Sequence, residues 1–61
     1  MNWELREGIY FCGPYRIVHG VRGWSVWYYD GASECLRREI RSLEAAKSIA
    51  ADHKTAQAVW P

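Results

Sequence analysis

The segment at residues 22–31, RGWSVWYYDG, constrains the fold most strongly because four of its ten residues are aromatic. Successive residues of a β-strand point to opposite faces of a sheet, so no single face can hold all four rings. The segment therefore predicts a strand with aromatic side chains on both faces. Asp30 and Gly31 tolerate positive φ, and they predict a tight hairpin turn directly after this strand.

Two further strands are predicted beside the aromatic one. Residues 15–19 are rich in β-branched and aromatic side chains, which favour strands, and residues 35–40 supply the third strand. Gly13 and Pro14 form a turn signal before the first of these strands. The residues that precede this turn form either a short edge strand or an ordered arm.

A helix is predicted from residue 42 to residue 57. Ser42 is a good N-cap, and Glu44 places a negative charge in the first turn, where the helix dipole favours it. The residues that recur at helical spacing on one stripe are Leu43, Ala46, Ile49, Ala50, His53 and Gln57. Ala46 and Ala50 are small, so the helix can approach a sheet of large side chains closely.

These elements predict one α+β domain spanning residues 1–61. A three-stranded antiparallel meander (residues 15–41) precedes one C-terminal α-helix, which packs on one face because neither element can otherwise bury its apolar side. Residues 1–14 are the arm or edge strand, and residues 58–61 are a tail that contains Trp60. The predicted core residues of the sheet are Ile17, Trp24, Val26, Tyr28, Leu36 and Ile40.

Strand alternation leaves the other face of the sheet free of the helix. Its predicted members are Arg16, Val18, Ser25, Trp27, Tyr29, Cys35 and Arg37. Aromatic and arginine side chains are enriched in protein interfaces, and arginine also pairs with phosphates and guanine edges. The candidate partner-binding residues are Arg16, Arg22, Trp27, Tyr29, Arg37 and Arg41. Alternatively, Trp60 or the N-terminal arm with Trp3 covers this face.

Charge gives only a local hint of a nucleic-acid partner. Eight basic residues stand against seven acidic ones, a balance that weakens the case for tight, non-specific binding of nucleic acid. Residues 36–41 hold the one local basic excess. They form either a solvated strand edge, where charges discourage aggregation, or a phosphate contact; Arg22 is open to the same two interpretations.

Other classes of function lack the sequence features they need. Cys12, His19, Cys35 and His53 are spread singly, without the short pairs that bring metal ligands together, so we expect no metal and no cofactor. No phosphate loop, nucleophile motif or carboxylate pair indicates an enzyme. The N-terminus lacks signal-peptide character and no apolar run could span a bilayer, so we expect a cytoplasmic protein.

Several short motifs carry a resemblance to a known fold. They are residues 19–23 (HGVRG), Trp24 and Trp27, and residues 40–46 (IRSLEAA). Over about residues 15–56, the chain resembles the three-strand-plus-helix fold of ethylene-response-factor DNA-binding domains and of phage integrase arm-site-binding domains. The resemblance implies that the exposed sheet face enters the DNA major groove. By position, the contacts would come from Arg16, Arg22, Trp27 and Arg37.

The length and style of the chain are also similar to those of small accessory proteins encoded by phages and prophages, some of which bind and inhibit a host protein. We therefore expect a non-catalytic binding module that uses the open sheet face. Double-stranded DNA is the first candidate partner. The alternative is a host protein that the chain inhibits or recruits, and a third possibility is a homodimer formed through the same face.

Overall fold

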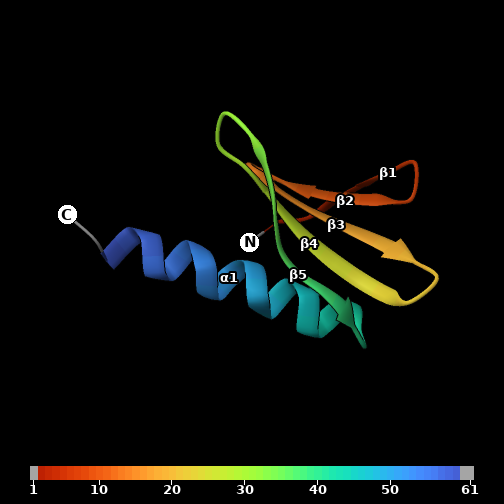
Figure 1. Ribbon diagram of the computed structural model, residues 1–61. Coiled ribbons are helices and arrows are strands. Elements are labelled where there is room, and N and C mark those ends of the chain that lie inside the picture. Colours follow the sequence, from red (N-terminus) through yellow and green to blue (C-terminus); the bar gives the residue numbers. More distant parts are fainter. Residues whose placement is uncertain (1, 60–61) are drawn as a thin grey trace.

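Every strand of the sheet is joined to the next by a short turn, so neighbours in the sheet are also neighbours in the chain. The computed structural model describes residues 2–59. The strands are β1 (Glu4–Arg6), β2 (Ile9–Cys12), β3 (Tyr15–Gly20), β4 (Gly23–Tyr29) and β5 (Ser33–Ile40). They form one antiparallel sheet in the order β1-β2-β3-β4-β5, and α1 (Leu43–Val59) follows (Figure 1).

The predicted class, an antiparallel sheet followed by a C-terminal helix, is confirmed, but the predicted number of three strands is wrong. The sheet has five strands, because the N-terminal residues fold into a hairpin of β1 and β2. Glu7 and Gly8, with φ of 51° and 80°, form the two-residue turn between them. Such turns need positive φ at both positions, which glutamate seldom adopts, so the sequence gives little sign of this hairpin.

Strand β5 does not alternate regularly against β4. Trp24 pairs with Ile40, Val26 with Arg37, and Trp27 with Cys35. Between the first two pairs, β4 has one residue and β5 has two. Between the second and third pairs, β5 has one extra residue and β4 has none. These two bulges, the first of which includes Glu39 at a φ of 58°, shift the residues in the second half of β5 relative to the predicted alternation.

The end of β5 also approaches the start of β4 very closely. A Cβ atom placed on Gly23 would lie 2.5 Å from the carbonyl oxygen of Ile40, and the φ of Gly23 is 121°. Both facts require glycine at this position. Gly23 therefore allows Trp24 and Ile40 to pair. This pairing places the Ile40 side chain in the core after the two bulges.

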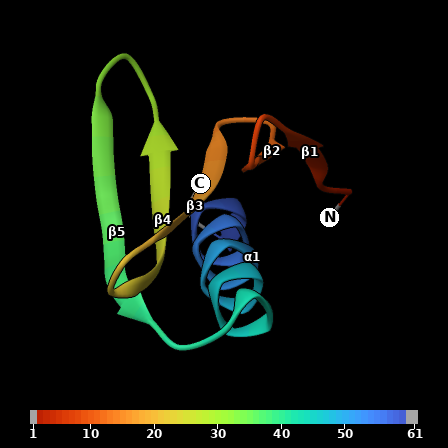
Figure 2. The ribbon, with the colours of Figure 1, turned by 90° about the vertical axis from the view of Figure 1, so that its right-hand side faces the viewer.

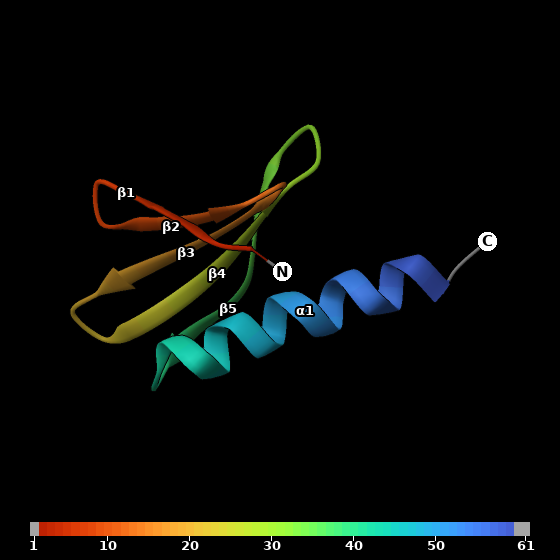
Figure 3. The same ribbon diagram turned by 180° about the vertical axis from the view of Figure 1, so that it is seen from behind.

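The helix packs across one side of the sheet, where it contacts β3, β4 and β5 (Figures 2 and 3). The buried core lies between these two layers and consists of Tyr15, Ile17, Val26, Ile40, Ala46 and Ala50. Three predicted core residues, Ile17, Val26 and Ile40, are thus buried. The half-buried residues at its border are Trp3, Tyr10, Trp24, Tyr28, Leu36, Leu43 and Ile49, and Tyr15 is the core residue that the sequence analysis missed.

The start of α1 follows the predicted capping. Ser42 Oγ accepts a hydrogen bond from the backbone N–H of Ala45 at 3.1 Å, and the Ser42 carbonyl accepts one from Ala46 at 3.1 Å. The helix continues to Val59, two residues beyond the predicted end, so the predicted tail begins inside it. The predicted packing of Trp60 lies outside the described residues.

Two side-chain hydrogen bonds hold the second half of α1 against the sheet. Tyr15 Oη lies 2.8 Å from His53 Nδ1, and Tyr28 Oη donates to Gln57 Oε1 at 3.1 Å. The ring of Tyr28 also packs on that of His53, with centroids 4.7 Å apart. His53 is therefore a boundary residue with a hydrogen-bonded ring. Burial, together with the nearby ionisable groups of Tyr28 and Cys12, raises the pKa of Tyr15 above its usual value of 10.0.

We expect Ala50→Leu to lower the free energy of unfolding by about 1–3 kcal/mol, because Ala50 is fully buried and the added methylenes overpack the interface. Urea denaturation of both proteins measures the change. Ala45→Leu is the matched control, since Ala45 is exposed on the same helix and the same substitution there should be nearly neutral. Equal stability of Ala50→Leu and the wild type would place the helix in a different rotation.

We expect Tyr15→Phe to lower the free energy of unfolding by about 0.5–1.5 kcal/mol near neutral pH, because His53 loses its hydrogen-bond partner. A raised pKa means that the folded state favours the neutral phenol. Its stabilisation is therefore present below the usual pKa of 10.0 and is lost as pH rises through the higher folded pKa.

Denaturation from pH 8 to pH 11.5 measures this dependence. Tyr15→Phe should lose less stability at the alkaline end than the wild type does. Identical alkaline profiles for Tyr15→Phe and the wild type would contradict the assignment.

Candidate functional site

The side of the sheet that α1 leaves uncovered, termed the open face below, is continuous across all five strands. Its residues follow from the register, because the neighbouring pair Ile17 and Val26 is buried on the helix side. The central row of the open face, in strand order, is Glu4, Phe11, Arg16, Trp27 and Cys35. The β1–β2 hairpin therefore widens this face beyond the three strands predicted.

Arginine and aromatic side chains alternate across one part of the open face. Arg6 Cζ lies 5.1 Å from the centre of the Phe11 ring, and Arg16 Cζ lies 5.2 Å from the same ring. Arg16 also stacks on Tyr29, at 4.0 Å. These cation–π contacts hold Arg16 between two rings while leaving the edge of its guanidinium group able to donate hydrogen bonds.

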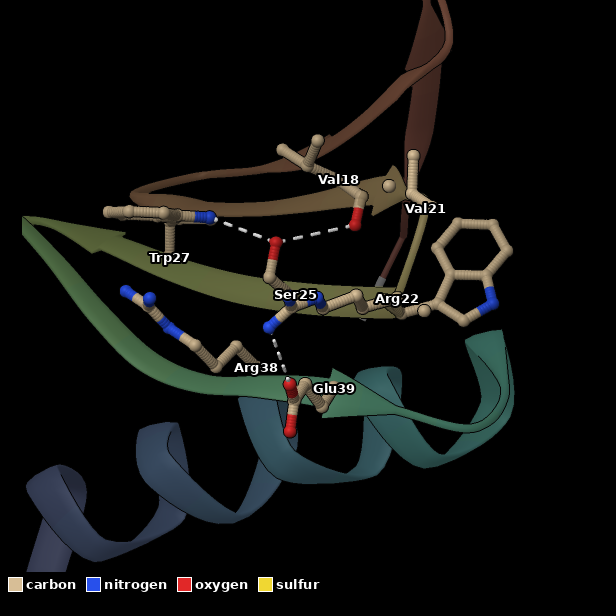
Figure 4. Close-up of a pocket in the computed structure, with 10 residues that line it drawn as sticks. Val18, Val21, Arg22, Ser25, Trp27, Arg38 and Glu39 are labelled. Carbon is tan, nitrogen blue, oxygen red and sulfur yellow. Dashed lines mark hydrogen bonds and ion pairs between the residues drawn. The ribbon is translucent and has the colours of Figure 1, made fainter.

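A hollow lies beside Trp27, the residue that pairs with Arg16 across β3 and β4 (Figure 4). The side chains that line it include Val18, Val21, Arg22, Ser25, Trp27, Arg38 and Glu39. Trp27 Nε1 donates to Ser25 Oγ at 3.1 Å, and Ser25 Oγ donates to the Val18 carbonyl at 3.4 Å. The Trp27 indole is thus held in one orientation before any partner binds.

An apolar side chain stands fully in solvent at the edge of this hollow. Val21, in the turn between β3 and β4, has a relative exposure of 106%, and Tyr29 on the same face has 40%. Neither residue packs into the core. The open face therefore offers apolar surface that the fold of the described chain does not use.

The charges around the hollow are arranged unevenly. Arg22 Nη1 and Glu39 Oε1 form an exposed ion pair at 3.6 Å. Arg38 lies on the same side of the sheet as Trp27 and makes no ion pair with any other described residue (Figure 4). At the other end of the open face, Arg6 Nε pairs with Glu4 Oε1 at 3.1 Å.

The structure brings three of the six predicted binding residues together, and it places a fourth, Arg22, in the turn before β4, at the opposite end of that strand from Tyr29. Arg16 pairs with Trp27 and stacks on Tyr29, and Arg22 lies at the hollow. The remaining two are exposed but stand apart: Arg37 pairs with the buried Val26 at a bulge, and Arg41 follows the end of β5.

Several residues of the open face were missed by the sequence analysis. Phe11 and Arg6 come from the N-terminal hairpin, whose residues were predicted to form either an edge strand or an arm and were not assigned to the open face. Arg38 takes the place predicted for Arg37, because the bulges of β5 shift its alternation. No sequence signal marks these bulges, since Glu39 is an unusual residue for positive φ.

The N-terminal residue proposed to cover the open face lies elsewhere. Trp3 packs at the border of the core and lines a shallow depression with Lys47 and Ala51 of the helix. Whether Trp60 covers the face falls outside the described residues. Within residues 2–57, for which side chains are described, the open face keeps its aromatic and arginine groups available.

The cysteine and histidine residues occupy separate environments. Cys12 lines a hollow with Tyr15 and Tyr28, Cys35 is on the open face beside Trp27, and both thiols are free. His19 stacks on Trp24 with the ring centres 4.1 Å apart. Among the described residues, no group of three histidine, cysteine or acidic side chains is placed to hold a metal ion.

Helix α1 is not long and apolar enough to cross a membrane, and the described part of the chain has no other helix. Comparisons with protein-family models, with curated proteins and with solved structures find no match to this chain. The similarity to three-strand-plus-helix DNA-binding domains therefore remains a resemblance in short motifs.

Proposed function

We propose that this chain is a small, non-catalytic module that binds another protein through the open face of its sheet. The observation that carries the proposal is a face that holds the fully exposed Val21 at one end of the hollow, a fixed Trp27 at the other, and the arginine-aromatic stack of Arg16 and Tyr29 (Figure 4). Tryptophan, tyrosine and arginine are the residues that most often dominate binding energy at protein interfaces. Side chains held in place before binding lose less conformational entropy when the partner arrives.

The charge distribution supports a protein partner over a nucleic acid. Two carboxylates, Glu4 and Glu39, lie among the arginines of the open face, and each is paired with one of them. Double-stranded DNA places a dense row of phosphates against such a surface, and its affinity depends on neutralising many of them. A partner with mixed apolar and polar surface fits this face better.

Double-stranded DNA is the second candidate, and a different group of side chains favours it. Arg37, Arg38 and Arg41 lie near the end of β5 and form no ion pair with other described residues. Arginines free of carboxylates are suited to phosphate contacts. This candidate agrees with the DNA-binding domains that the sequence motifs resemble.

The similarity to phage accessory proteins suggests a host protein as the partner. The chain would then act as an inhibitor or an adaptor of that protein. The open face could also join two copies of the chain. Analytical ultracentrifugation at several concentrations distinguishes a homodimer from a complex with a host protein, because a homodimer forms without any added partner.

We expect Val21→Ser to weaken capture of the partner from a lysate of the source cells by about 5- to 30-fold, equivalent to about 1–2 kcal/mol of apolar contact. The fold should be unchanged, because Val21 packs on nothing in the described chain. Quantitative pull-down on immobilised protein, with a melting curve for each variant, measures both effects.

Leu5→Ser is the matched control, since Leu5 is also exposed but pairs with Tyr10, which packs on the core side of the sheet. It should capture the partner as the wild type does. Equal capture by Val21→Ser and the wild type would contradict binding through the open face.

The same experiment distinguishes protein from DNA. Capture of a protein should survive nuclease treatment and change little with salt, whereas DNA binding weakens steeply as salt rises. Tight binding to random duplex at low salt, with a salt slope that falls by about one for Arg37→Ala, would replace the protein partner by DNA.

A further inference from the structure

The hollow beside Trp27 has two chemically distinct sides. One side is an apolar wall formed by Val18, Val21 and the Trp27 indole. The other side carries the positive charge of the Arg22 and Arg38 guanidinium groups (Figure 4). The hollow has a volume of about 500 Å³. This volume is within the range of sites that hold small ligands, about 300–1,000 Å³, and it is sufficient for one or two side chains of a bound polypeptide.

The two arginines differ in how free they are to bind. Arg22 is paired with Glu39 at 3.6 Å, but their side chains are 85% and 60% exposed, so the pair contributes little and can rearrange. Arg38 has no carboxylate partner in the described chain. A negative group entering the hollow can therefore pair with Arg38 directly without separating a strong internal ion pair.

The formal charge of the hollow indicates what kind of anion it accepts. Arg22 and Arg38 together with Glu39 give a net charge of +1. One carboxylate balances this charge, whereas a phosphate that carries two charges exceeds it and meets stronger repulsion from Glu39. The adjoining apolar wall favours a large apolar side chain next to that carboxylate.

We infer that the hollow beside Trp27 binds an aspartate or glutamate that is flanked by a large apolar residue in the partner polypeptide. The inference rests on the proposed protein-binding function and specifies the partner's chemistry. The apolar side chain packs on the Trp27 indole, and the carboxylate accepts hydrogen bonds from Arg38, which lies on the same side of the sheet (Figure 4).

Nuclear magnetic resonance titration with two blocked peptides tests the inference. The probes are acetyl-Gly-Phe-Asp-Gly-amide and the same peptide with asparagine in place of aspartate. The reporters are the indole N–H of Trp27, assigned by its loss in Trp27→Phe, and the Nε–H of Arg38. We expect saturable shifts of both reporters with the aspartate peptide and at least about tenfold weaker binding of the asparagine peptide.

Two neighbouring arginines provide the matched variants. Arg38→Gln should abolish the preference for aspartate, and Arg37→Gln should keep it, because Arg37 does not line the hollow. Equal affinity for the two peptides, shifts confined to other parts of the chain, or an equal loss in both variants would overturn the inference. Larger shifts with sodium phosphate than with the aspartate peptide would also overturn it, in favour of a phosphate ligand.

The outcome can be separated from that of the proposed function. Capture that depends on Val21, combined with equal affinity for the two peptides, would reject the acidic motif and retain the binding face. Failure of both measurements would reject the open face as a protein-binding surface.

Discussion

The close packing of Ala46 and Ala50 on the sheet determines the arrangement of the remaining parts. Both alanines are fully buried, and their small side chains bring α1 against Ile17 and Val26 in the middle of the core. The single helix of the described residues packs on one face of the sheet. The aromatic residues that alternation directs to the other side of β4 are therefore left on an uncovered surface.

This uncovered surface is more ordered than a solvated face needs to be. Arg16 is held between Phe11 and Tyr29, and the indole of Trp27 is fixed by its hydrogen bond to Ser25. The chain thus maintains a set of rigid aromatic and cationic groups that its own core does not use. The N-terminal hairpin contributes to this order, since it supplies Phe11 and extends the sheet on the side away from β5.

The parts of the fold that could be predicted are those in which local chemistry and burial agree. The strand at Gly23–Tyr29 is rich in strand-forming residues, Ser42 is a typical N-cap, and the alanine stripe has a helical period; the structure contains all three. The remaining parts depend on backbone conformations that their residues rarely adopt. Positive φ at Glu7 creates the extra hairpin, and positive φ at Glu39 accompanies a bulge that exchanges the predicted places of Arg37 and Arg38. Pairing between neighbouring strands stabilises both conformations, and no local sequence pattern predicts that pairing.

The division of the sheet into a helix-covered face and an open face is tested most directly by nuclear Overhauser effects. In isotopically labelled protein, the methyl groups of Ala46 and Ala50 should show such effects to the side chains of Ile17 and Val26, which share their buried cluster. No effects should connect the helix with the rings of Phe11 or Trp27 on the opposite side. Strong effects between α1 and either of those rings would show that the helix covers the other face, and they would contradict the binding surface described above.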